Sequence, residues 1–299
     1  MNEVQRIGIP RSIFHYEYRG IFQRFFECLG FDVVLSLPTN RTVFQLGKEK
    51  IIDELCFPLK VYAGHVLSLA AAGVRPIFIP VITGSDNDRS FLCHYQIHMQ
   101  DIVRNLQLVP EEEVLTGVFN FDRNGFLEDG FYQVGRDLGV GPERVNRALA
   151  AVRRSEAMTN HPGNPPSDVA IGLLGREYLT QDGWASMDVA QILSARRVII
   201  LTERDFQDLN FYPDDVPAHF TMSARTLDIA RRMNLREDIA GIIFLLPFNC
   251  GPDSDIAHQL VAEASKPFLT LVIDELASRE GLTTRLEAFM DLLQLETTA

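Results

Sequence analysis

The sequence has few cysteines and a shortage of basic residues. Its four cysteines, Cys28, Cys56, Cys93 and Cys250, are spread over 299 residues. This wide spacing excludes the dense disulfide framework of a small secreted domain. Lys and Arg total 28 against 40 Asp and Glu, a formal net charge of -12. That balance excludes binding to nucleic acid or to an anionic membrane through a general basic field.

Long apolar runs and familiar catalytic motifs are also missing. The longest apolar stretches, such as IIFLLPF, have the length of a strand, far short of the roughly 20 residues of a spanning helix. The start, MNEVQRIGIP, shows no targeting pattern. We therefore expect a cytoplasmic protein that does not enter the membrane. No Walker A loop, Gly-x-Ser-x-Gly elbow or His-Glu-x-x-His motif occurs.

What is present is enough apolar material for two domains of ordinary size. Hydrophobic residues make up 46% of the chain, which supplies a substantial core. The stretch TNHPGNPPS at 159–167 has the composition of a linker. We place the boundary there, which predicts an N-terminal domain at 1–160, carrying Cys56 and Cys93, and a C-terminal domain at 161–299, carrying Cys250.

The opening pattern of the chain returns after this linker. IGIPRSIFHYEY near the start and IGLLGREYLTQD in the second half both place a glycine in a strand and an arginine at its end. The chain therefore predicts two similar Rossmann-like or flavodoxin-like α/β halves with mainly parallel sheets. Strands are expected at 7–9, 31–37, 76–82, 114–121, 171–175, 197–201, 242–248 and 267–273. Helices are expected at 14–29, 40–53, 58–72, 142–158, 184–193, 256–264 and from 283 onward.

The stretch GIIFLLPFNCGPDS at 241–254 combines a strand with a cysteine. Its continuous apolar run predicts a strand buried on both faces, which delivers Cys250 to the edge of a sheet. Asp253 or Ser254 is suited to cap the helix that follows. A helix start favours the thiolate, which binds metal or acts as a nucleophile. The alternative is a small thiol buried in the core.

Two other cysteines lie in a sequence setting similar to that of Cys250. Cys56 and Cys250 share the pattern Cys-x-Pro, each ahead of a predicted helix, and Cys93 follows another strand. Three thiolates bind zinc, with His94 or His98 as a fourth ligand, or a 4Fe-4S cluster with one iron open. No Cys-x-x-Cys spacing occurs, and both histidines also fit an ordinary surface or core position.

The remaining candidates have plainer interpretations. Cys28 falls on or beside the apolar face of the helix at 14–29, which predicts a role in packing. Four charged residues lie near the other cysteines in sequence and fit either a site or capping and solvated surface: Glu54, Lys60, Asp253 and Asp255. For Lys60 the plain alternative is a side chain that faces water.

Several stretches together resemble a known family. They are IGIPRSIFHYEYRGIFQRFFECLGFDVVLSLPTN, DELCFPLKVYAGHV, LPFNCGPDSDIAHQL and LVIDELASREGLTTRLEAFMDLL. They look like the CoA-substrate-specific enzyme activase, or CoA protein activase, relatives of the 2-hydroxyacyl-CoA dehydratases. That group resembles the iron-sulfur subunits of these dehydratases and of benzoyl-CoA reductases, as well as the double-cubane cluster proteins.

The resemblance implies an oxygen-sensitive 4Fe-4S cluster in the cleft between the halves, held by Cys56, Cys93 and Cys250. A separate ATP-hydrolysing iron-sulfur activator would reduce it, so that the chain passes low-potential electrons to a substrate or partner. A related cluster-bearing subunit or a homodimer is a further implied partner. The alternatives are a dehydratase or reductase subunit acting on a CoA thioester, and a zinc-binding or metal-free scaffold.

The chain departs from the family pattern in two places. His94 follows Cys93 where the family often has proline, and GREY at 175–178 replaces Gly-Arg-Pro-Tyr. Neither change removes a thiolate, but both alter the surroundings of the implied site. With three suitable cysteines, the chain favours a single cubane over a double one.

Overall fold

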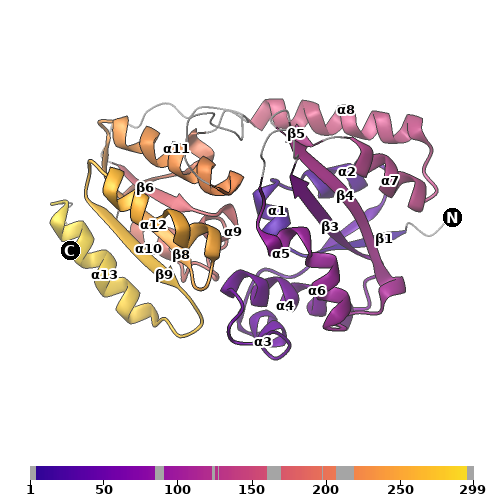
Figure 1. Ribbon diagram of the computed structural model, residues 1–299, viewed down its shortest axis with the longest axis horizontal. Coiled ribbons are helices and arrows are strands. Elements are labelled where there is room, and N and C mark those ends of the chain that lie inside the picture. The colour runs from indigo at the N-terminus through magenta and orange to yellow at the C-terminus, as the bar shows by residue number, and fades with distance from the viewer. Residues whose placement is uncertain are drawn as a thin grey trace. The chain divides into compact units, whose positions relative to one another are not determined.

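The computed structural model describes residues 5–84, 91–122, 125–126, 128–159, 170–196, 198–206 and 219–294. The chain divides into two compact units, Met1–Asn160 and His161–Ala299. The predicted linker at 159–167 lies, except for Thr159, outside the described residues. Each unit is an α/β structure with its own sheet, as the sequence predicts (Figure 1).

The first unit contains a five-stranded sheet with the order β2-β1-β3-β4-β5. Four of its strands run parallel, and the short β5 pairs antiparallel with β4. This order is that of a flavodoxin-like doubly wound sheet. The strands are β1 (Arg6–Ile9), β2 (Asp32–Leu35), β3 (Ile77–Gly84), β4 (Val114–Asp122) and β5 (Gly125–Phe126).

The helices of this unit cover both faces of the sheet (Figure 1). They are α1 (Ile13–Glu17), α2 (Ile21–Cys28), α3 (Arg41–Lys48), α4 (Phe57–Ala71), α5 (His94–Ile97), α6 (Met99–Asn105), α7 (Asp129–Asp137) and α8 (Pro142–Thr159). Phenylalanines from α2 and α7 pack against Phe78 of β3 and Phe119 of β4 with ring centroids 4.8–6.0 Å apart. Aromatic rings therefore form the core on this face.

The single helix predicted at 14–29 is wrong, because the chain breaks it into α1 and α2. Arg19 and Gly20 between them adopt left-handed angles, with φ of 47° and 69°. Arg24 donates from Nη1 to the Arg19 carbonyl oxygen at 2.6 Å, which gives that oxygen a partner outside a helix. The apolar spacing persists across the break because both helices face the same core, so periodicity alone does not reveal it.

Helices α3 and α4 touch backbone to backbone through two glycines. A Cβ at Gly47 would lie 1.9 Å from the Lys60 carbonyl oxygen, and a Cβ at Gly64 would lie 1.9 Å from the Val43 carbonyl oxygen. Only glycine permits this approach. The crossing fixes α4 and therefore positions Cys56, the residue that precedes it.

The second unit contains a parallel four-stranded sheet with the order β7-β6-β8-β9. Its strands are β6 (Ala170–Gly175), β7 (Ile199–Thr202), β8 (Ile239–Pro247) and β9 (Phe268–Ile273). Its helices are α9 (Glu177–Thr180), α10 (Val189–Ser194), α11 (Thr221–Leu235), α12 (Gly251–Glu263) and α13 (Arg279–Leu292). Helix α10 is shorter than predicted, because Met187 and Asp188 ahead of it have left-handed angles.

The two sheets have the same order of parallel strands, so the prediction of two similar halves is confirmed. Strand β6 corresponds to β1 and β8 to β3, each pair occupying the same place in the order. Strand β8 is buried on both faces, as its continuous apolar run predicts. Residues of α11 and α12 share its core on one face, while a Cβ at Gly241 would lie 2.9 Å from Phe289 of α13.

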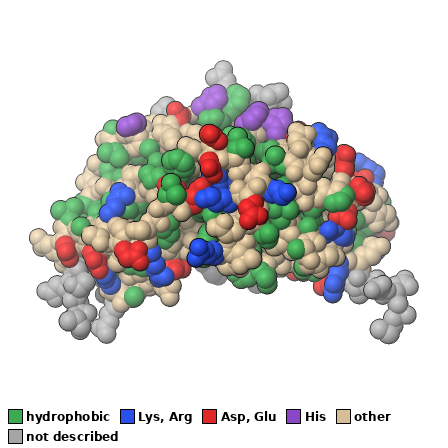
Figure 2. All heavy atoms as spheres, turned by 90° about the horizontal axis from the view of Figure 1, so that it is seen from below, with side chains coloured by type: hydrophobic (Ala, Val, Ile, Leu, Met, Phe, Trp, Pro, Cys, Tyr) green, Lys and Arg blue, Asp and Glu red, His purple; other side chains and the backbone are tan. Residues whose placement is uncertain are grey.

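The surface mixes charges of both signs. On the face in Figure 2, acidic and basic side chains are interspersed with apolar ones.

None of the helices in the described part of the chain is long and apolar enough to cross a membrane.

Candidate functional site

Three of the four cysteines occupy the same local position, the N-cap of a helix. Cys56 precedes α4, Cys93 precedes the single turn α5, and Cys250 precedes α12. Cys56 and Cys250 are buried and Cys93 is partly buried. In a parallel sheet, ligands bind beyond the carboxyl ends of the strands. Cys93 and Cys250 follow the corresponding strands β3 and β8, so the two cysteines occupy matching places in the two units.

Cys250 itself, rather than Asp253 or Ser254, is the N-cap of α12, which corrects the sequence-based expectation. The strand β8 ends at Pro247, and Asn249 turns the chain with a left-handed φ of 57°. The Cys250 carbonyl oxygen then accepts the first helical bond, from the Ser254 amide at 3.0 Å. Asp253 therefore lies in the first turn of α12, where its carboxylate can pair with a residue outside this helix.

Cys56 begins α4 in a similar way, with Pro58 in the first turn as predicted. Neither Cys56 nor Cys250 makes a capping hydrogen bond through its sulfur. Lys60, one turn later, is fully buried, so the alternative that it faces water is wrong. Its Nζ donates to the Asp53 carbonyl oxygen at 3.0 Å and lies 3.9 Å from Asp53 Oδ1.

Cys56 and Cys93 both act electrostatically on Tyr95, the second residue after Cys93. The thiols of both raise the pKa of the Tyr95 hydroxyl, after the larger effect of burial. Two of the three predicted ligands therefore interact electrostatically with the same side chain of the first unit. His94 and His98 are exposed, with ring centroids 4.5 Å apart, and His98 Nδ1 lies 3.2 Å from Asp101 Oδ2.

In the second unit, Arg176 and Asp253 form a buried ion pair beside Cys250. Arg176 directly follows β6, and Asp253 lies three residues after Cys250. Arg176 Nε donates to the two carboxylate oxygens at 2.8 and 3.1 Å, and its Nη2 lies 2.7 Å from Oδ1. Side-chain exposure is 7% for Arg176 and 1% for Asp253. This two-point contact holds the strand end against the helix start.

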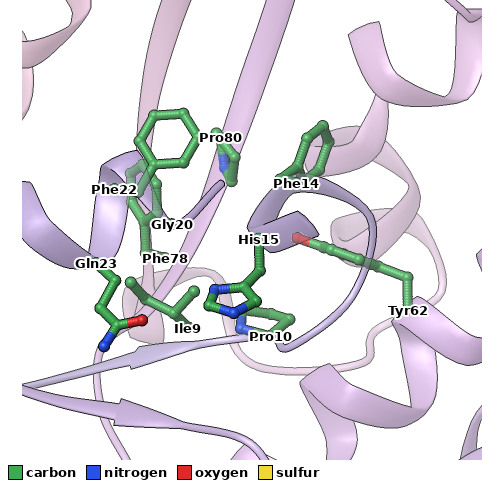
Figure 3. Close-up of a pocket in the computed structure, with 10 residues that line it drawn as sticks. All are labelled: Ile9, Pro10, Phe14, His15, Gly20, Phe22, Gln23, Tyr62, Phe78 and Pro80. Carbon is green, nitrogen blue, oxygen red and sulfur yellow. The ribbon is translucent and has the colours of Figure 1, made fainter. Parts of the chain in front are cut away.

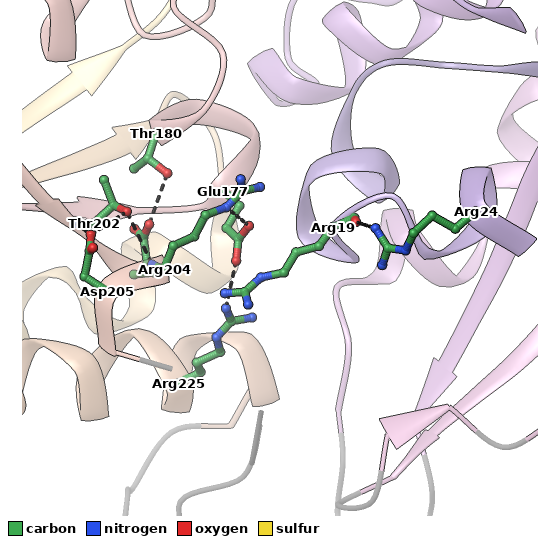
Figure 4. A network of polar contacts seen from close by, with 9 residues as sticks. Arg19, Arg24, Glu177, Thr180, Thr202, Arg204, Asp205 and Arg225 are labelled. Carbon is green, nitrogen blue, oxygen red and sulfur yellow. Dashed lines mark hydrogen bonds and ion pairs between the residues drawn. The ribbon is translucent and has the colours of Figure 1, made fainter. Parts of the chain in front are cut away.

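A second group of buried charges lies at the same edge. Glu177 accepts from Arg204 Nε at 2.8 Å and from Arg225 Nη2 at 3.0 Å (Figure 4). Glu203, which follows β7, accepts from the Gly175 amide and from Thr180 Oγ1 at 3.0 Å. Burial, and next the Glu177 charge, raise the pKa of Glu203 from 4.5 to about 8. A carboxyl group there holds its proton at neutral pH.

The first unit has a neutral network at its corresponding edge. His65 of α4 is fully buried, and its ring nitrogens lie 2.8 Å from Ser36 Oγ and 2.9 Å from Thr39 Oγ1. The Arg11 amide donates to Ser36 Oγ at 2.7 Å. Burial, followed by the Arg11 charge, lowers the pKa of His65 to about 3. His65 therefore stays uncharged and links α4 to the chain after β2.

An apolar pocket lies beside the end of β1 and the first half of β3 in the same unit. Its lining residues are mainly apolar: Ile9, Pro10, Phe14, His15, Gly20, Phe22, Gln23, Tyr62, Phe78 and Pro80. Figure 3 shows Tyr62 reaching in from α4, with its hydroxyl directed toward the pocket. That hydroxyl is buried and has no hydrogen-bond partner among the described residues.

The structure separates Cys28 from the other three cysteines. Cys28 is exposed at the end of α2, so the packing role predicted for it is wrong. Within the described ranges, no group of three or more His, Cys, Asp or Glu side chains forms a ready metal site. Because Cys250 belongs to the other unit, a three-cysteine site would need ligands from both units and stays a prediction.

Sequence reasoning missed the buried polar groups near the strand ends. His65, Glu203 and Arg225 are buried and hydrogen-bonded, yet each comes from a segment distant in sequence from its partners. A histidine inside the apolar run of α4 and the acidic residue directly after β7 were the available signals. The arginine in GREY was noted, but its partner Asp253 lies 77 positions away.

Fold and site together define a protein of two flavodoxin-like units with cysteines at helix starts beyond the strand ends. Residues 6–205 match the family model described as CoA enzyme activase uncharacterised domain (DUF2229). The chain belongs to this family, which spans most of the first unit together with β6 and β7 of the second. No curated protein matches the chain.

Proposed function

We propose that this protein holds a 4Fe-4S cluster through Cys56, Cys93 and Cys250 and passes on low-potential electrons. The observation that carries the proposal is the shared N-cap position of these three cysteines, which Cys28 does not have. Membership of a CoA enzyme activase family supports it. A cluster of this kind, when bound, takes up and releases one electron at a potential set by its surroundings.

The chain's own groups fit such a cofactor. The positive ends of α4 and α12 favour thiolates at Cys56 and Cys250, the form that binds iron. Burial of both cysteines limits access of water and oxygen. The Arg176–Asp253 pair fixes the first turn of α12 after Cys250, and the His65 network holds α4, the helix that Cys56 precedes.

The partner in this proposal is a separate ATP-hydrolysing iron-sulfur activator that reduces the cluster in the cytoplasm. A related cluster-bearing subunit or a second copy of the chain would complete the assembly. Reduction driven by hydrolysis reaches potentials that an ordinary ferredoxin does not supply. The electron would then pass to a substrate or to a CoA-dependent enzyme component.

Anaerobic purification with iron, sulfide and zinc analysis and electron paramagnetic resonance tests this function. We expect brown protein with about four iron and four sulfide per chain. Cys56→Ser, Cys93→Ser and Cys250→Ser should each lose most of the iron, whereas the matched control Cys28→Ser should keep it. Colourless protein that carries zinc, or equal iron in all four variants, would contradict the proposal.

The family description also favours a second candidate, a subunit that acts on a CoA thioester itself. Protonated Glu203 at the strand ends is a group that fits acid catalysis at neutral pH. Turnover of an acyl-CoA by the cluster-loaded chain with its activator would support this candidate. Absence of any acyl-CoA binding would leave the electron-transfer role alone.

A further inference from the structure

Lys60 is a charged residue that lies fully buried near the start of α4. Moving an ammonium group from water into a protein interior is costly unless other groups compensate its charge. The backbone of Lys60 is packed against α3, because a Cβ at Gly47 would lie 1.9 Å from the Lys60 carbonyl oxygen. The side chain therefore starts from a position that the crossing of α3 and α4 fixes.

The Lys60 side chain runs back toward the N-terminal end of α4. Its Nζ donates to the Asp53 carbonyl oxygen at 3.0 Å, and Asp53 precedes Cys56 by three residues. Lys60 lies four positions after the N-cap Cys56. Side chains at this spacing are neighbours on one face of a helix, with Cβ atoms about 5–6 Å apart. The hydrogen bond thus ties the chain before Cys56 to the helix after it.

The Asp53 carboxylate compensates the ammonium charge only weakly. Its Oδ1 lies 3.9 Å from Nζ and the side chain is 83% exposed, so that water screens the attraction. Cys56, in contrast, is 8% exposed. A thiolate at Cys56 would place a negative charge in the same buried surroundings as the ammonium group, where the attraction between opposite charges is stronger than in water.

We propose that Lys60 is a positioning residue for the cluster ligand Cys56 and that its charge raises the reduction potential of the cluster. This inference rests on the function proposed above. The hydrogen bond to Asp53 keeps Cys56 in place, as groups around the ligands do at other metal sites. A fixed positive charge near a cluster stabilises the reduced form, which carries one more electron, and so raises the potential.

Iron analysis and a redox titration followed by electron paramagnetic resonance, on anaerobically purified full-length protein, test the role of Lys60. Lys60→Met removes the charge and the donor, and an apolar group of similar size is generally tolerated in place of a buried charge. We expect a more negative midpoint potential and, in competition with EDTA, an affinity for iron about 10–100-fold lower. Lys60→Arg keeps the charge and should stay close to the wild-type potential. Lys50→Met removes an exposed lysine and should change neither quantity.

Lys60→Gln is a second neutral variant, used if circular dichroism shows that Lys60→Met folds poorly. It should give the same negative shift in potential. Wild-type protein without iron would contradict the proposed function itself. Wild-type protein that holds the cluster, with the same potential and iron affinity in the neutral variants, would overturn the role of Lys60 alone. A negative shift of equal size in Lys60→Arg would overturn the assignment of the effect to charge.

Discussion

The two units share a strand order but stabilise their strand ends by different chemistry. The first unit uses a neutral network, in which the buried His65 links two hydroxyl groups. The second unit uses charges, with Arg176 on Asp253 and Arg225 on Glu177. Topology therefore fixes where polar groups gather, while the residue types decide whether that place is charged.

The two edges also differ in whether their buried polar groups have hydrogen-bond partners. In the second unit the strand-end arginine is paired within the fold. In the first, Arg11 Nε and Gln96 Oε1 lack partners among the described residues. Charges that are paired within the fold contribute to stability, whereas Arg11 Nε and Gln96 Oε1 are among the few buried polar atoms that have no hydrogen bond in the described chain.

The largest change in stability is expected from removing Asp253, the carboxylate that pairs with Arg176 in the second unit. Asp253→Ala leaves Arg176 buried without its partner, so we expect a loss of about 3–5 kcal/mol in the free energy of unfolding. Denaturant titration measures this loss. Glu263→Ala breaks the more exposed pair with Arg231, 2.7 Å apart, and should cost about 0–1 kcal/mol. Similar losses in both variants would refute the distinction.

A smaller effect is expected from a change that affects only the first unit. Gly64→Ala places a Cβ 1.9 Å from the Val43 carbonyl oxygen, so α3 and α4 must move apart. We expect a loss of about 1–3 kcal/mol in stability, measured by denaturant unfolding. The matched control is Gly141→Ala, since nothing lies within 4 Å of its added Cβ. A Gly64→Ala variant as stable as this control would show that the helices do not cross in contact.

The smallest effect is expected in the pH dependence of stability, where His65 in the first unit and Glu203 in the second act in opposite directions. Folded His65 has a pKa of about 3 against 6.5 when unfolded, so its contribution is present above pH 6.5 and is lost as pH falls toward 3. Folded Glu203 has a pKa of about 8 against 4.5, so its contribution is present below pH 4.5 and is lost as pH rises toward 8.

Unfolding free energies measured across this pH range test that prediction. Each pKa unit corresponds to about 1.4 kcal/mol, so the slopes are measurable. His65→Gln should flatten the curve between pH 3 and 6.5, and Glu203→Gln should flatten it between pH 4.5 and 8. Parallel curves for the wild type and both variants would mean that neither group titrates differently on folding.

Much of the fold is predictable from local pattern. Continuous apolar runs identified β3, β8 and β9, and the Gly-containing strands with arginine at their ends identified the repeat. The break between α1 and α2 was missed because the apolar spacing continues across it, although Gly20 at the break is a residue type that readily adopts a left-handed angle. The contact of α3 with α4 could not be predicted from the sequence either, because a glycine inside a helix does not indicate which element packs against it.

The candidate site divides in the same way. The Cys-x-Pro patterns correctly predicted that Cys56 and Cys250 lie at helix starts. The pattern did not reveal that Asp253 would pair with Arg176 rather than cap its helix. A carboxylate at the start of a helix can either cap the helix or form an ion pair with a neighbouring arginine. Only the position of the neighbouring strand end decides which of the two occurs.

The sequence by itself determined two α/β units and the placement of Cys56 and Cys250 at helix starts, because periodicity and turn residues act over a few neighbouring positions. Tertiary structure alone decided which polar side chains meet and which are buried. Glu203 and His65 owe their shifted pKa values to burial, which depends on packing by distant segments. Arg176 and Arg11 look alike in sequence, but the folded chain gives a carboxylate to the first and leaves Nε of the second buried without a partner among the described residues.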